Sequence, residues 1–385
     1  MRVLHYVDRW LPQTQPWIYN QLRFLPEVES HVVCRGTENL DQFPWPRIHS
    51  LAREPALRQL WDRALRFASG GRHRPFVRRM IRDADPDLLH SHFGHEGWYN
   101  LRAVRETGAR HVVTFYGQDV SWRPVALPRW RQRYRELFDT ADLFLCEGPH
   151  MAGELHRLGC PRDRIVVHRL GVDLQRIAFS PRRWAPGRTL RVLMASSFRE
   201  KKGIPYGLEA LGRLRGSYPL EVTVVGDAVD QPGSQREKQR ILAAIEAAGL
   251  GDAIQLPGFL PHDRLLEEAF AHHLFLAPSV TAVDGDAEGG APVSIIEMAA
   301  SGMPIVTTRH CDIPEVVVSG VNAELADERD VDGLVGGLET LLRAHEEWPD
   351  RLAAGRRHVD ERFDAAAQGA ALAQRYQTLL ERGDR

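Results

Sequence analysis

The sequence predicts an α/β protein with two Rossmann-like domains, each built around a parallel sheet. Short apolar segments typical of buried strands alternate with longer helical segments over nearly the whole chain. Strands separated by helices indicate parallel pairing through right-handed crossovers. The 385 residues also exceed the roughly 250–300 that a single hydrophobic core accommodates, which favours two domains.

The expected strands fall into two series, separated by a stretch rich in proline and arginine at 180–188. We therefore place an N-terminal domain at 1–178 and a C-terminal domain at 189–362. The Ala-rich segment 363–385 closes the chain and contains an expected helix. The first series of strands is 2–7, 30–34, 87–93, 111–117, 143–148 and 164–171; the second is 191–197, 221–227, 253–258, 274–279 and 304–308.

The two halves of the chain differ in charge. Residues 1–175 hold 26 arginines and no lysine against 20 acids, whereas the remainder holds 24 basic and 31 acidic residues. The four cysteines form no CxxC pair, so neither a zinc site nor a disulfide framework is indicated. The N-terminus lacks the apolar run of a signal peptide, and no segment approaches the roughly 20 apolar residues that span a bilayer. These features favour a cytoplasmic protein.

An acidic, glycine-rich loop at 281–292 lies between the strand 274–279 and an expected helix at 293–301, which Gly302 ends. Ligands of open parallel sheets bind at the carboxyl ends of the strands. The start of a helix, with its free amides and positive dipole end, attracts anions such as a diphosphate. The predicted diphosphate site comprises Gly289, Gly290, Ala291, Pro292 and Val293.

Two glutamates flank this turn. Glu297 lies about one turn into the helix among apolar and small neighbours, which favours a carboxylate that binds the two ribose hydroxyls of a nucleotide. Glu288 precedes the glycines and can reach sugar hydroxyls. The alternative is that Glu288, Asp284 and Asp286 are solvated loop acids and that Glu297 is a partly exposed helix residue.

A basic loop follows the strand 191–197. Lys202 stands beside Gly203, which places an ammonium group next to a flexible backbone that a pyrophosphate can approach. Lys201 and Lys202 are two of only three lysines in the chain, which favours function for both. The alternative is a solvated start of a helix.

Three histidines, His90, His92 and His95, lie in and just after the strand 87–93. The first two share a face of the strand, but His95 falls in the loop, and no carboxylate or cysteine completes a familiar ligand set. We therefore expect no metal cofactor.

Residues 288–317 (EGGAPVSIIEMAASGMPIVTTRHCDIPEVV) resemble the C-terminal signature of retaining glycosyltransferase family 4. They are most similar to the subgroup that makes exopolysaccharide, colanic-acid-type or lipopolysaccharide sugars. The family separates its two glutamates by seven residues, whereas eight separate Glu288 from Glu297. The resemblance implies the GT-B fold: two facing Rossmann-like domains, a nucleotide-sugar donor bound mainly by the C-terminal one, and a last helix that crosses back to the N-domain.

Four further segments carry the resemblance. The family's R-x-x-x-K-K-G segment neutralises the leaving diphosphate; Lys202 matches its second lysine, Ser197 occupies the arginine position, and Arg199 is a candidate substitute. The H-x-H-F-G-x-x-G segment lines the acceptor side and points to His92.

The T-F-H-G-x-D segment borders the transferred sugar in the family. Tyr116 replaces its usual histidine, and Asp119 is kept, either to orient the acceptor or sugar or to cap a turn. Gln15 replaces the glutamate of the subgroup's S-E-T-F-I segment, and either shapes the acceptor site or caps a helix.

The resemblance implies a retaining, metal-independent hexosyltransferase. It would move a sugar from a nucleotide-diphosphate sugar to a saccharide or lipid-linked saccharide in bacterial surface polysaccharide synthesis. Two alternatives remain open: a non-catalytic nucleotide-sugar binder in a polysaccharide assembly complex, and a GT-B-like nucleotide-sugar epimerase. The predicted catalytic residues are Lys202, Glu288, Asp119 and His92, and the donor is predicted to contact Glu297, Ser197, Arg199, Lys201 and the turn from Gly289 to Val293.

Arginine is dense at 53–82 and 123–135, where five aromatic residues are interleaved: Trp61, Phe67, Phe76, Trp130 and Tyr134. A basic face with aromatic side chains can lie on an anionic membrane, which predicts a peripheral location at the inner face of the cell membrane. The alternative is a solvated helix face in an arginine-rich protein. No nucleic-acid-binding module is recognisable, so we expect no nucleic-acid partner.

Overall fold

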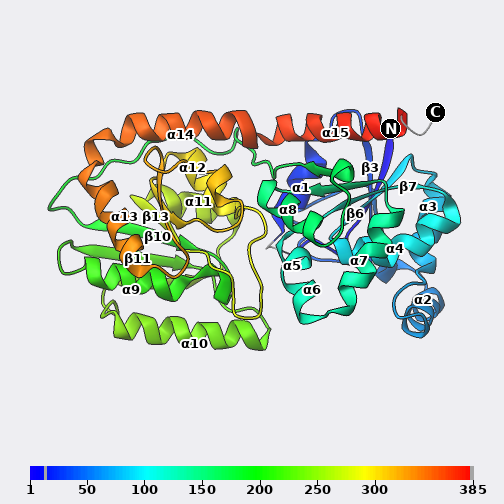
Figure 1. The fold of residues 1–385 in the computed structure, drawn as a ribbon, viewed down its shortest axis with the longest axis horizontal. Coiled ribbons are helices and arrows are strands. Elements are labelled where there is room, and N and C mark those ends of the chain that lie inside the picture. Colours follow the sequence, from blue (N-terminus) through cyan, green and yellow to red (C-terminus); the bar gives the residue numbers. More distant parts are fainter. Residues whose placement is uncertain (13–14, 382–385) are drawn as a thin grey trace. The chain divides into compact units, whose positions relative to one another are not determined.

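The computed structural model describes residues 1–12 and 15–381. They form two compact units: residues 1–171 together with those from 365 onward, and residues 172–364 (Figure 1). Each unit contains a parallel sheet with its own helices. The predicted α/β class with two Rossmann-like domains is therefore confirmed.

The sheet of the first unit has its strand order reversed between β1 and β6, and every pair of neighbouring strands is parallel. Such a switch point leaves a crevice at the carboxyl ends of the two strands. The order across the sheet is β5 (Ile48–Ser50), β3 (Glu29–Cys34), β1 (Arg2–Tyr6), β6 (Leu88–His92), β7 (Arg110–Thr114), β8 (Leu143–Cys146) and β9 (Ile165–Val167).

Both faces of this sheet are covered because successive side chains of a strand point to opposite sides. Leu4 and Leu89 pack in a cluster with α3 and α4, while Val3 and Leu88 pack with Leu372 of the last helix. That helix, α15 (Ala365–Glu381), thus packs on the first unit, as predicted. The other helices of the unit are α1 (Pro16–Arg23), α2 (Ala56–Ala68), α3 (Pro75–Ala84), α4 (Gly94–Thr107), α5 (Gly117–Val120), α6 (Trp122–Ala126), α7 (Arg129–Thr140) and α8 (Pro149–Arg157).

The sheet of the second unit is also entirely parallel and reverses its order between β10 and β13. Its order is β12 (Ile254–Gly258), β11 (Leu220–Val225), β10 (Leu190–Ala195), β13 (Leu274–Ala277), β14 (Ile305–Thr308) and β15 (Ala323–Ala326). Its helices are α9 (Ile204–Leu214), α10 (Pro232–Ala247), α11 (His262–Phe270), α12 (Val293–Ser301), α13 (Val331–Arg343) and α14 (Trp348–Phe363).

Alternation along β10 divides the core of the second unit between the two faces of the sheet. Val192 and Met194 pack in one cluster with side chains from α9 and α13, and Leu193 packs in the other with side chains from α12. Every predicted strand is present. The strands β5 and β15 were not predicted, because β5 spans three residues and β15 (AELA) has no β-branched residue.

The boundary between the units differs from the predicted one. Residues 172–178, which we placed in the first domain, belong to the second unit, as does the expected linker. Val172 pairs with Asp364, and both Val172 and Ile177 pack in the core of the second unit. The guanidinium of Arg182 donates to the carbonyl oxygen of Ser301 at 2.9 Å. These contacts fix a segment that its composition alone suggested was a connector.

Within residues 1–12 and 15–381, no helix combines the length and the apolar character needed to cross a bilayer.

Candidate functional site

The two loops singled out in the C-terminal half meet in one pocket of the second unit. This pocket lies at the carboxyl ends of β10 and β13, where the strand order reverses. Crevices at such switch points are the usual ligand sites of open α/β sheets. The lining residues are Met194, Ala195, Ser196, Lys202, Ile204, Leu276, Ala277, Pro278, Ser279, Glu288, Pro292 and Ser294.

Lys202 is held in the pocket by a sharp change of backbone direction. It ends the short 3₁₀ helix η3 (Glu200–Lys202), and Gly203 then adopts a left-handed conformation with φ of 62° before α9 begins. A Cβ on Gly203 would lie 1.8 Å from the carbonyl oxygen of Pro278. Only glycine fits this position, and the resulting turn directs the Lys202 ammonium to 2.8 Å from Glu288.

The Glu288 side chain is nearly buried and has polar partners on its carboxylate. One of its oxygens accepts a hydrogen bond from the Ser279 hydroxyl at 3.0 Å, and the carboxylate pairs with Lys202. Burial opposes the ionisation of Glu288, but the ammonium groups of Lys202 and Lys201 outweigh it and hold its pKa well below the usual value. Burial lowers the pKa of Lys202, which Glu288 partly offsets. Glu288 is therefore not a solvated loop acid.

Lys201 and Arg199 hold the acidic loop through ion pairs with Asp286. The ammonium of Lys201 lies 3.2 Å from Asp286 and donates to the carbonyl oxygen of Ala287 at 2.9 Å, and Arg199 pairs with Asp286 at 3.2 Å. Lys201 is buried. These two predicted donor-binding cations are therefore engaged by Asp286, whereas Lys202 faces the pocket.

The glycine turn is fixed by two residues that sequence reasoning missed. The backbone N–H of Glu288 donates to His310 Nε2 at 3.1 Å, and that of Gly289 donates to Cys311 Sγ at 3.3 Å. His310 Nδ1 is bonded in turn to Glu328 at 2.6 Å. Both missed residues come within three positions of the end of β14, so the signal that could have found them was their place at the carboxyl end of a strand.

The predicted diphosphate site is consequently smaller than expected. The N–H of Gly289, which adopts a φ of 81°, is taken by Cys311, and Pro292 has no N–H to offer. Helix α12 begins at Val293, and Pro292 and Ser294 line the pocket. The Ile295 N–H is bonded to the Pro292 carbonyl oxygen at 3.0 Å, so the first two amides of α12, those of Val293 and Ser294, are the helix donors offered to an anion, together with the Lys202 ammonium.

Glu297 lies one turn into α12, as predicted, and it is buried. Its partner was not predicted: the His262 imidazole, at the start of α11, lies 2.7 Å from Glu297 Oε1. This hydrogen bond and the charge of Glu297 raise the pKa of His262, although burial opposes the shift. His262 follows the strand β12, and it therefore brings a third strand end toward the ribose site predicted at Glu297.

Ser197 lies half-buried in the loop after β10 and is not among the residues that line the pocket; its neighbour Ser196 lines it instead.

In the first unit, Gln15 occupies the N-cap position of α1, but its side chain makes no capping hydrogen bond. The interpretation of Gln15 as a helix cap is therefore wrong as far as its side chain is concerned.

His92 lies at the end of β6 and is completely buried. Its Nδ1 is 2.8 Å from the Tyr116 hydroxyl, and its Nε2 is 3.3 Å from His5 Nδ1. Desolvation lowers the pKa of His92 to about 3, so the imidazole is neutral at physiological pH. With both nitrogens engaged, His92 positions Tyr116 and presents no free nitrogen for a ligand.

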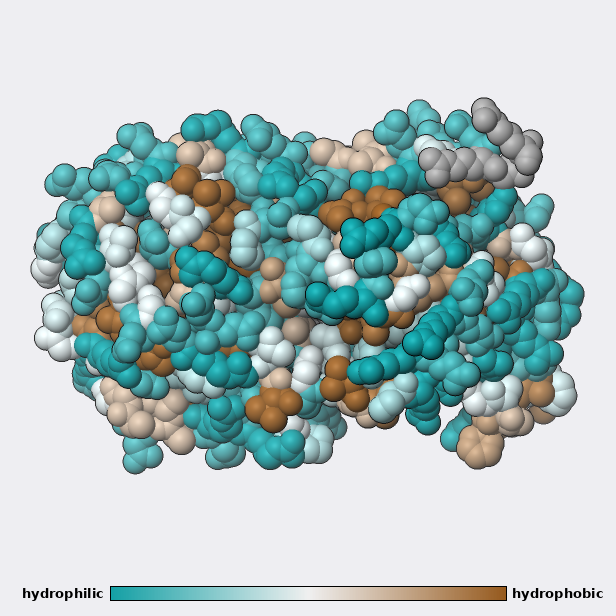
Figure 2. All heavy atoms as spheres, viewed as in Figure 1, coloured by the Kyte–Doolittle hydropathy of each residue, from teal (hydrophilic) through white to brown (hydrophobic). Residues whose placement is uncertain are grey.

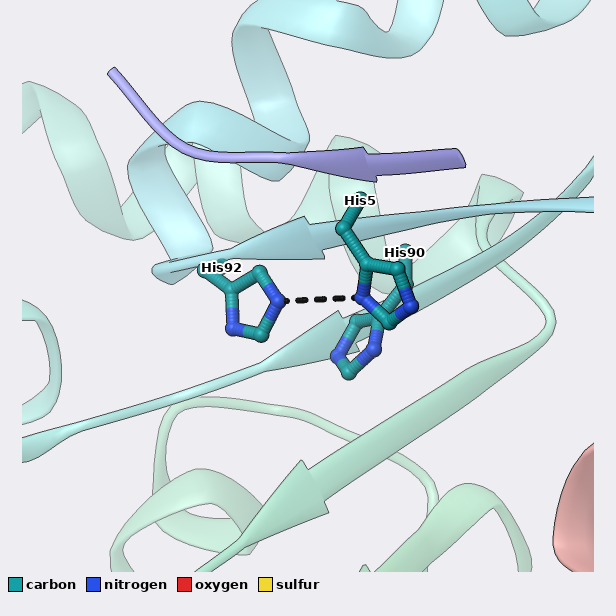
Figure 3. A group of neighbouring side chains, drawn as sticks. All are labelled: His5, His90 and His92. Carbon is teal, nitrogen blue, oxygen red and sulfur yellow. Dashed lines mark hydrogen bonds between the residues drawn. The ribbon is translucent and has the colours of Figure 1, made fainter. Parts of the chain in front are cut away.

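Figure 3 shows that His5, from β1, lies beside His90 and His92, and these three histidines, without His95, form the cluster. Ligand atoms of these three side chains lie within 4.8 Å of one another. His90 already bonds the Tyr376 and Thr114 hydroxyls, at 2.7 and 2.6 Å. The His90 and His92 rings stack with centroids 4.4 Å apart. Nitrogen lone pairs lie in the ring plane, so those of stacked rings do not converge on one ion. The absence of a metal cofactor stays a prediction.

Asp119 joins two loops of the first unit. One carboxylate oxygen accepts the Gly94 N–H at 2.6 Å, and the other accepts the Tyr116 N–H at 2.9 Å. Burial raises the pKa of Asp119 to about 7, although these two hydrogen bonds oppose the shift. The geometry matches the alternative of a turn acid, because both oxygens are directed at backbone amides.

Replacing Asp119 by asparagine is expected to destabilise the fold by about 1–3 kcal/mol, because the new amide group would meet a backbone N–H donor. Thermal unfolding measures this. The exposed Asp139, on α7, provides the matched control variant Asp139→Asn, which should unfold like the wild type. An Asp119→Asn protein of unchanged stability that has lost its enzymatic rate would instead assign Asp119 to the reaction.

Comparison with known sequences decides the family. The family model described as Glycosyl transferases group 1 matches residues 179–357, and the one described as Glycosyltransferase Family 4 matches residues 17–176. The putative colanic acid biosynthesis glycosyltransferase WcaL of Salmonella typhimurium is 32% identical over 76% of this chain and 71% of its own length. The chain belongs to glycosyltransferase family 4. The amylovoran biosynthesis glycosyltransferase AmsK of Erwinia amylovora is 31% identical to this glycosyltransferase, over 72% of the chain and 67% of AmsK.

Solved structures agree with this assignment at the level of the fold. The structure of Anabaena HepE in complex with UDP and glucose matches this glycosyltransferase with a TM-score of 0.76, over 98% of this chain and 99% of HepE. The two sequences are 17% identical, so the likeness concerns architecture. The predicted GT-B fold is confirmed.

Proposed function

We propose that this glycosyltransferase is a retaining, metal-independent hexosyltransferase. Its donor is a nucleotide-diphosphate sugar, and its acceptor is a saccharide or lipid-linked saccharide of a bacterial surface polysaccharide. The relatives that act in colanic acid and amylovoran biosynthesis support the polysaccharide class. The HepE complex with UDP and glucose supports the donor class.

One observation carries the proposal: Lys202, Glu288 and the start of α12 line one pocket at the switch point of the second sheet. An ammonium and the free amides of a helix start are suited to a diphosphate. Glu297, further along α12, presents a buried carboxylate suited to a ribose diol. Glu288 is suited to the hydroxyls of the sugar once the diphosphate draws Lys202 toward itself.

In the proposed reaction the bond between sugar C1 and the β-phosphate oxygen breaks, and a bond from C1 to the acceptor oxygen forms on the same face. The electrons of the broken bond leave with the diphosphate, and a phosphate oxygen takes the acceptor proton. Lys202 stabilises the charge that develops on the leaving group, which is where electrostatic catalysis acts most strongly. We also propose that the acceptor is reached at an anionic membrane surface, toward which the arginine-rich N-domain would turn.

The test is a thermal-shift screen of nucleoside diphosphates and nucleotide sugars on the wild type and on Glu297→Ala. A ligand that binds only the folded state raises the unfolding midpoint by mass action. We expect one nucleotide family to stabilise the wild type and to lose most of its effect on Glu297→Ala. Glu246→Ala, at an exposed site on α10, is the control and should respond like the wild type.

Incubation with the stabilising donor then separates the competing functions. Transfer to a saccharide acceptor supports the proposal. Interconversion of the donor sugar without an acceptor would indicate the epimerase, and binding without turnover would indicate the non-catalytic binder. A screen in which no nucleotide moves the midpoint of the wild type would contradict the donor site itself.

A further inference from the structure

Helix α2 (Ala56–Ala68, labelled in Figure 1) exposes its bulkiest apolar side chains to solvent and buries an acidic one. Leu57 is 81% exposed, Leu60 61%, Trp61 62% and Phe67 91%. The only buried residue of α2 is Asp62. Surface helices of globular proteins show the opposite arrangement, with the apolar stripe facing the core.

The exposed residues form one continuous face. Leu57, Leu60, Trp61, Ala64 and Phe67 follow the spacing of three and four residues that places side chains on one side of a helix. In the space-filling view, brown and tan side chains gather over α2, at the lower right (Figure 2). The stripe is therefore a patch of contiguous apolar surface rather than a set of scattered exposed residues.

Polar contacts explain why the helix keeps this orientation. The Asp62 carboxylate accepts the backbone N–H of Phe76, at the start of α3, at 3.1 Å and pairs with Arg66 at 2.6 Å. The Gln59 amide donates to the carbonyl oxygens of Glu54, at 2.8 Å, and Ala52, at 3.2 Å. Turning the stripe inward would break these bonds and bury charge, so these contacts hold the apolar face outward.

The surroundings of the stripe are strongly basic. Residues 53–82 contain nine arginines and two acids, Glu54 and Asp62. Two further acids, Asp83 and Asp85, follow this segment. Both acids are engaged within the unit, Glu54 with Arg58 and Arg79, and Asp62 with Arg66. Arg63 lies on the exposed side of α2. Arg72, Arg74 and Arg78 pair with glutamates outside the segment, whereas Arg53, Arg63 and Arg82 make no ion pair with the residues that the structure describes. An apolar stripe in a segment with this remaining positive charge complements a surface that is apolar beneath an anionic layer.

The second basic segment, 123–135, contributes less to a membrane-binding surface than its sequence suggested. Trp130 and Tyr134, which we counted among the interleaved aromatic residues, are buried in the core of the first unit, and so is Phe76. Trp61 and Phe67 alone of that set are exposed. The membrane-facing chemistry therefore concentrates on α2.

We propose that α2 is an interfacial anchor that lies in the plane of an anionic bilayer. Leu57, Leu60, Trp61 and Phe67 enter the boundary between headgroups and acyl chains, and the neighbouring arginines contact lipid phosphates. Amphipathic helices with bulky apolar residues on one face and arginine beside them bind membranes in this way. This inference deepens the proposed function, since it rests on an acceptor presented at a membrane and assigns the helix that reaches it.

Flotation of the whole chain with vesicles tests the anchor. Vesicles of phosphatidylglycerol and phosphatidylethanolamine are compared with phosphatidylcholine vesicles at low and high salt, with no donor present. We expect binding to the anionic vesicles only, weakened by salt. The double variant Trp61→Ser/Phe67→Ser should bind at least about tenfold more weakly, and Arg63→Gln about fivefold more weakly.

Leu242→Ser, at a partly exposed site on α10, is the matched control and should bind like the wild type. Because all substituted side chains are exposed, unfolding midpoints should stay unchanged. Failure of the wild type to float with anionic vesicles at low salt would overturn the proposal, as would a double variant that binds normally. Loss of a wild-type dimer in the double variant, without vesicle binding, would mean that a second copy covers the stripe.

The outcome is independent of the donor site. A protein that shows the nucleotide-induced thermal shift but binds no vesicle keeps its proposed transferase function and loses only the anchor. A protein that binds vesicles through α2 but responds to no nucleotide loses the donor assignment, and the anchor remains.

Discussion

Lys202→Met is expected to lower kcat by about 100- to 1,000-fold, which is the usual loss when one preorganised charge is removed from a developing negative centre. The ammonium of Lys202 is the cation directed at the pocket, since Lys201 and Arg199 are engaged by Asp286. Steady-state transfer with the donor found in the thermal-shift screen measures the effect. KM should change much less than kcat, because the charge acts most strongly when the sugar–phosphate bond breaks.

Lys202→Met also leaves Glu288 without its closest partner, so activity must be separated from stability. Ser279 and, at 3.9 Å, Lys201 remain near the carboxylate, and we expect the variant to lose about 1–3 kcal/mol of unfolding free energy. The double variant Lys202→Met/Glu288→Gln buries no unpaired charge and should recover part of that stability without recovering activity.

The remaining lysine of the chain provides the control. Lys238 pairs with Asp227 at 2.7 Å and does not line the pocket. Lys238→Met should therefore keep kcat within about threefold, since loss of a surface ion pair costs at most about 1 kcal/mol. A Lys202→Met enzyme as active as Lys238→Met would show that the diphosphate is neutralised elsewhere.

Gly203→Ala is expected to destabilise the second unit by about 4 kcal/mol or more, which is the range reached only by severe steric conflicts. Two effects add. The φ of 62° strains any residue with a Cβ, and that atom would stand 1.8 Å from the carbonyl oxygen of Pro278. Because the backbone fixes the positions of both the Cβ and the carbonyl oxygen, no side-chain rotation relieves the overlap, and η3 must move away from Pro278 at the end of β13.

Gly249 separates the two contributions. Its φ is 63°, but a Cβ there would meet no atom within 4 Å. Gly249→Ala should therefore cost only the backbone strain, about 1–2 kcal/mol. Chemical denaturation of the two variants gives the difference. Equal losses of unfolding free energy in the two variants would mean that Gly203 lies farther from Pro278 than the structure places it.

The movement forced on η3 also predicts a functional loss in any Gly203→Ala protein that still folds. Lys202 immediately precedes the glycine, and its ammonium depends on this turn to reach the pocket. The nucleotide-induced thermal shift should therefore shrink in Gly203→Ala and persist in Gly249→Ala.

The sequence alone was sufficient for the class of fold and for the elements that form the pocket. Apolar periodicity is a local property, so the strands and the boundaries of α12, with Gly302 at its left-handed end, could be predicted from neighbouring residues. The positions of Lys202, Glu288 and Glu297 after strand ends could likewise be predicted from neighbouring residues. The rule that parallel strands gather their carboxyl ends then predicted that these residues lie near one another.

What only the tertiary structure decided was which of two similar residues faces the pocket. Lys201 and Lys202 are adjacent in the chain, yet one braces Asp286 and the other faces the pocket. His92 was expected near a ligand but is buried against His5, 87 positions earlier.

Helix α2 illustrates the same distinction. Its periodicity predicts a helix with one apolar face, but the direction of that face depends on the hydrogen bond that the Phe76 N–H donates to the Asp62 carboxylate. Helix and strand patterns arise from contacts a few residues apart, so the sequence determines them directly. The orientation of a face and the partner of a charge arise from contacts between distant segments, because burial and pairing are settled only when those segments pack together.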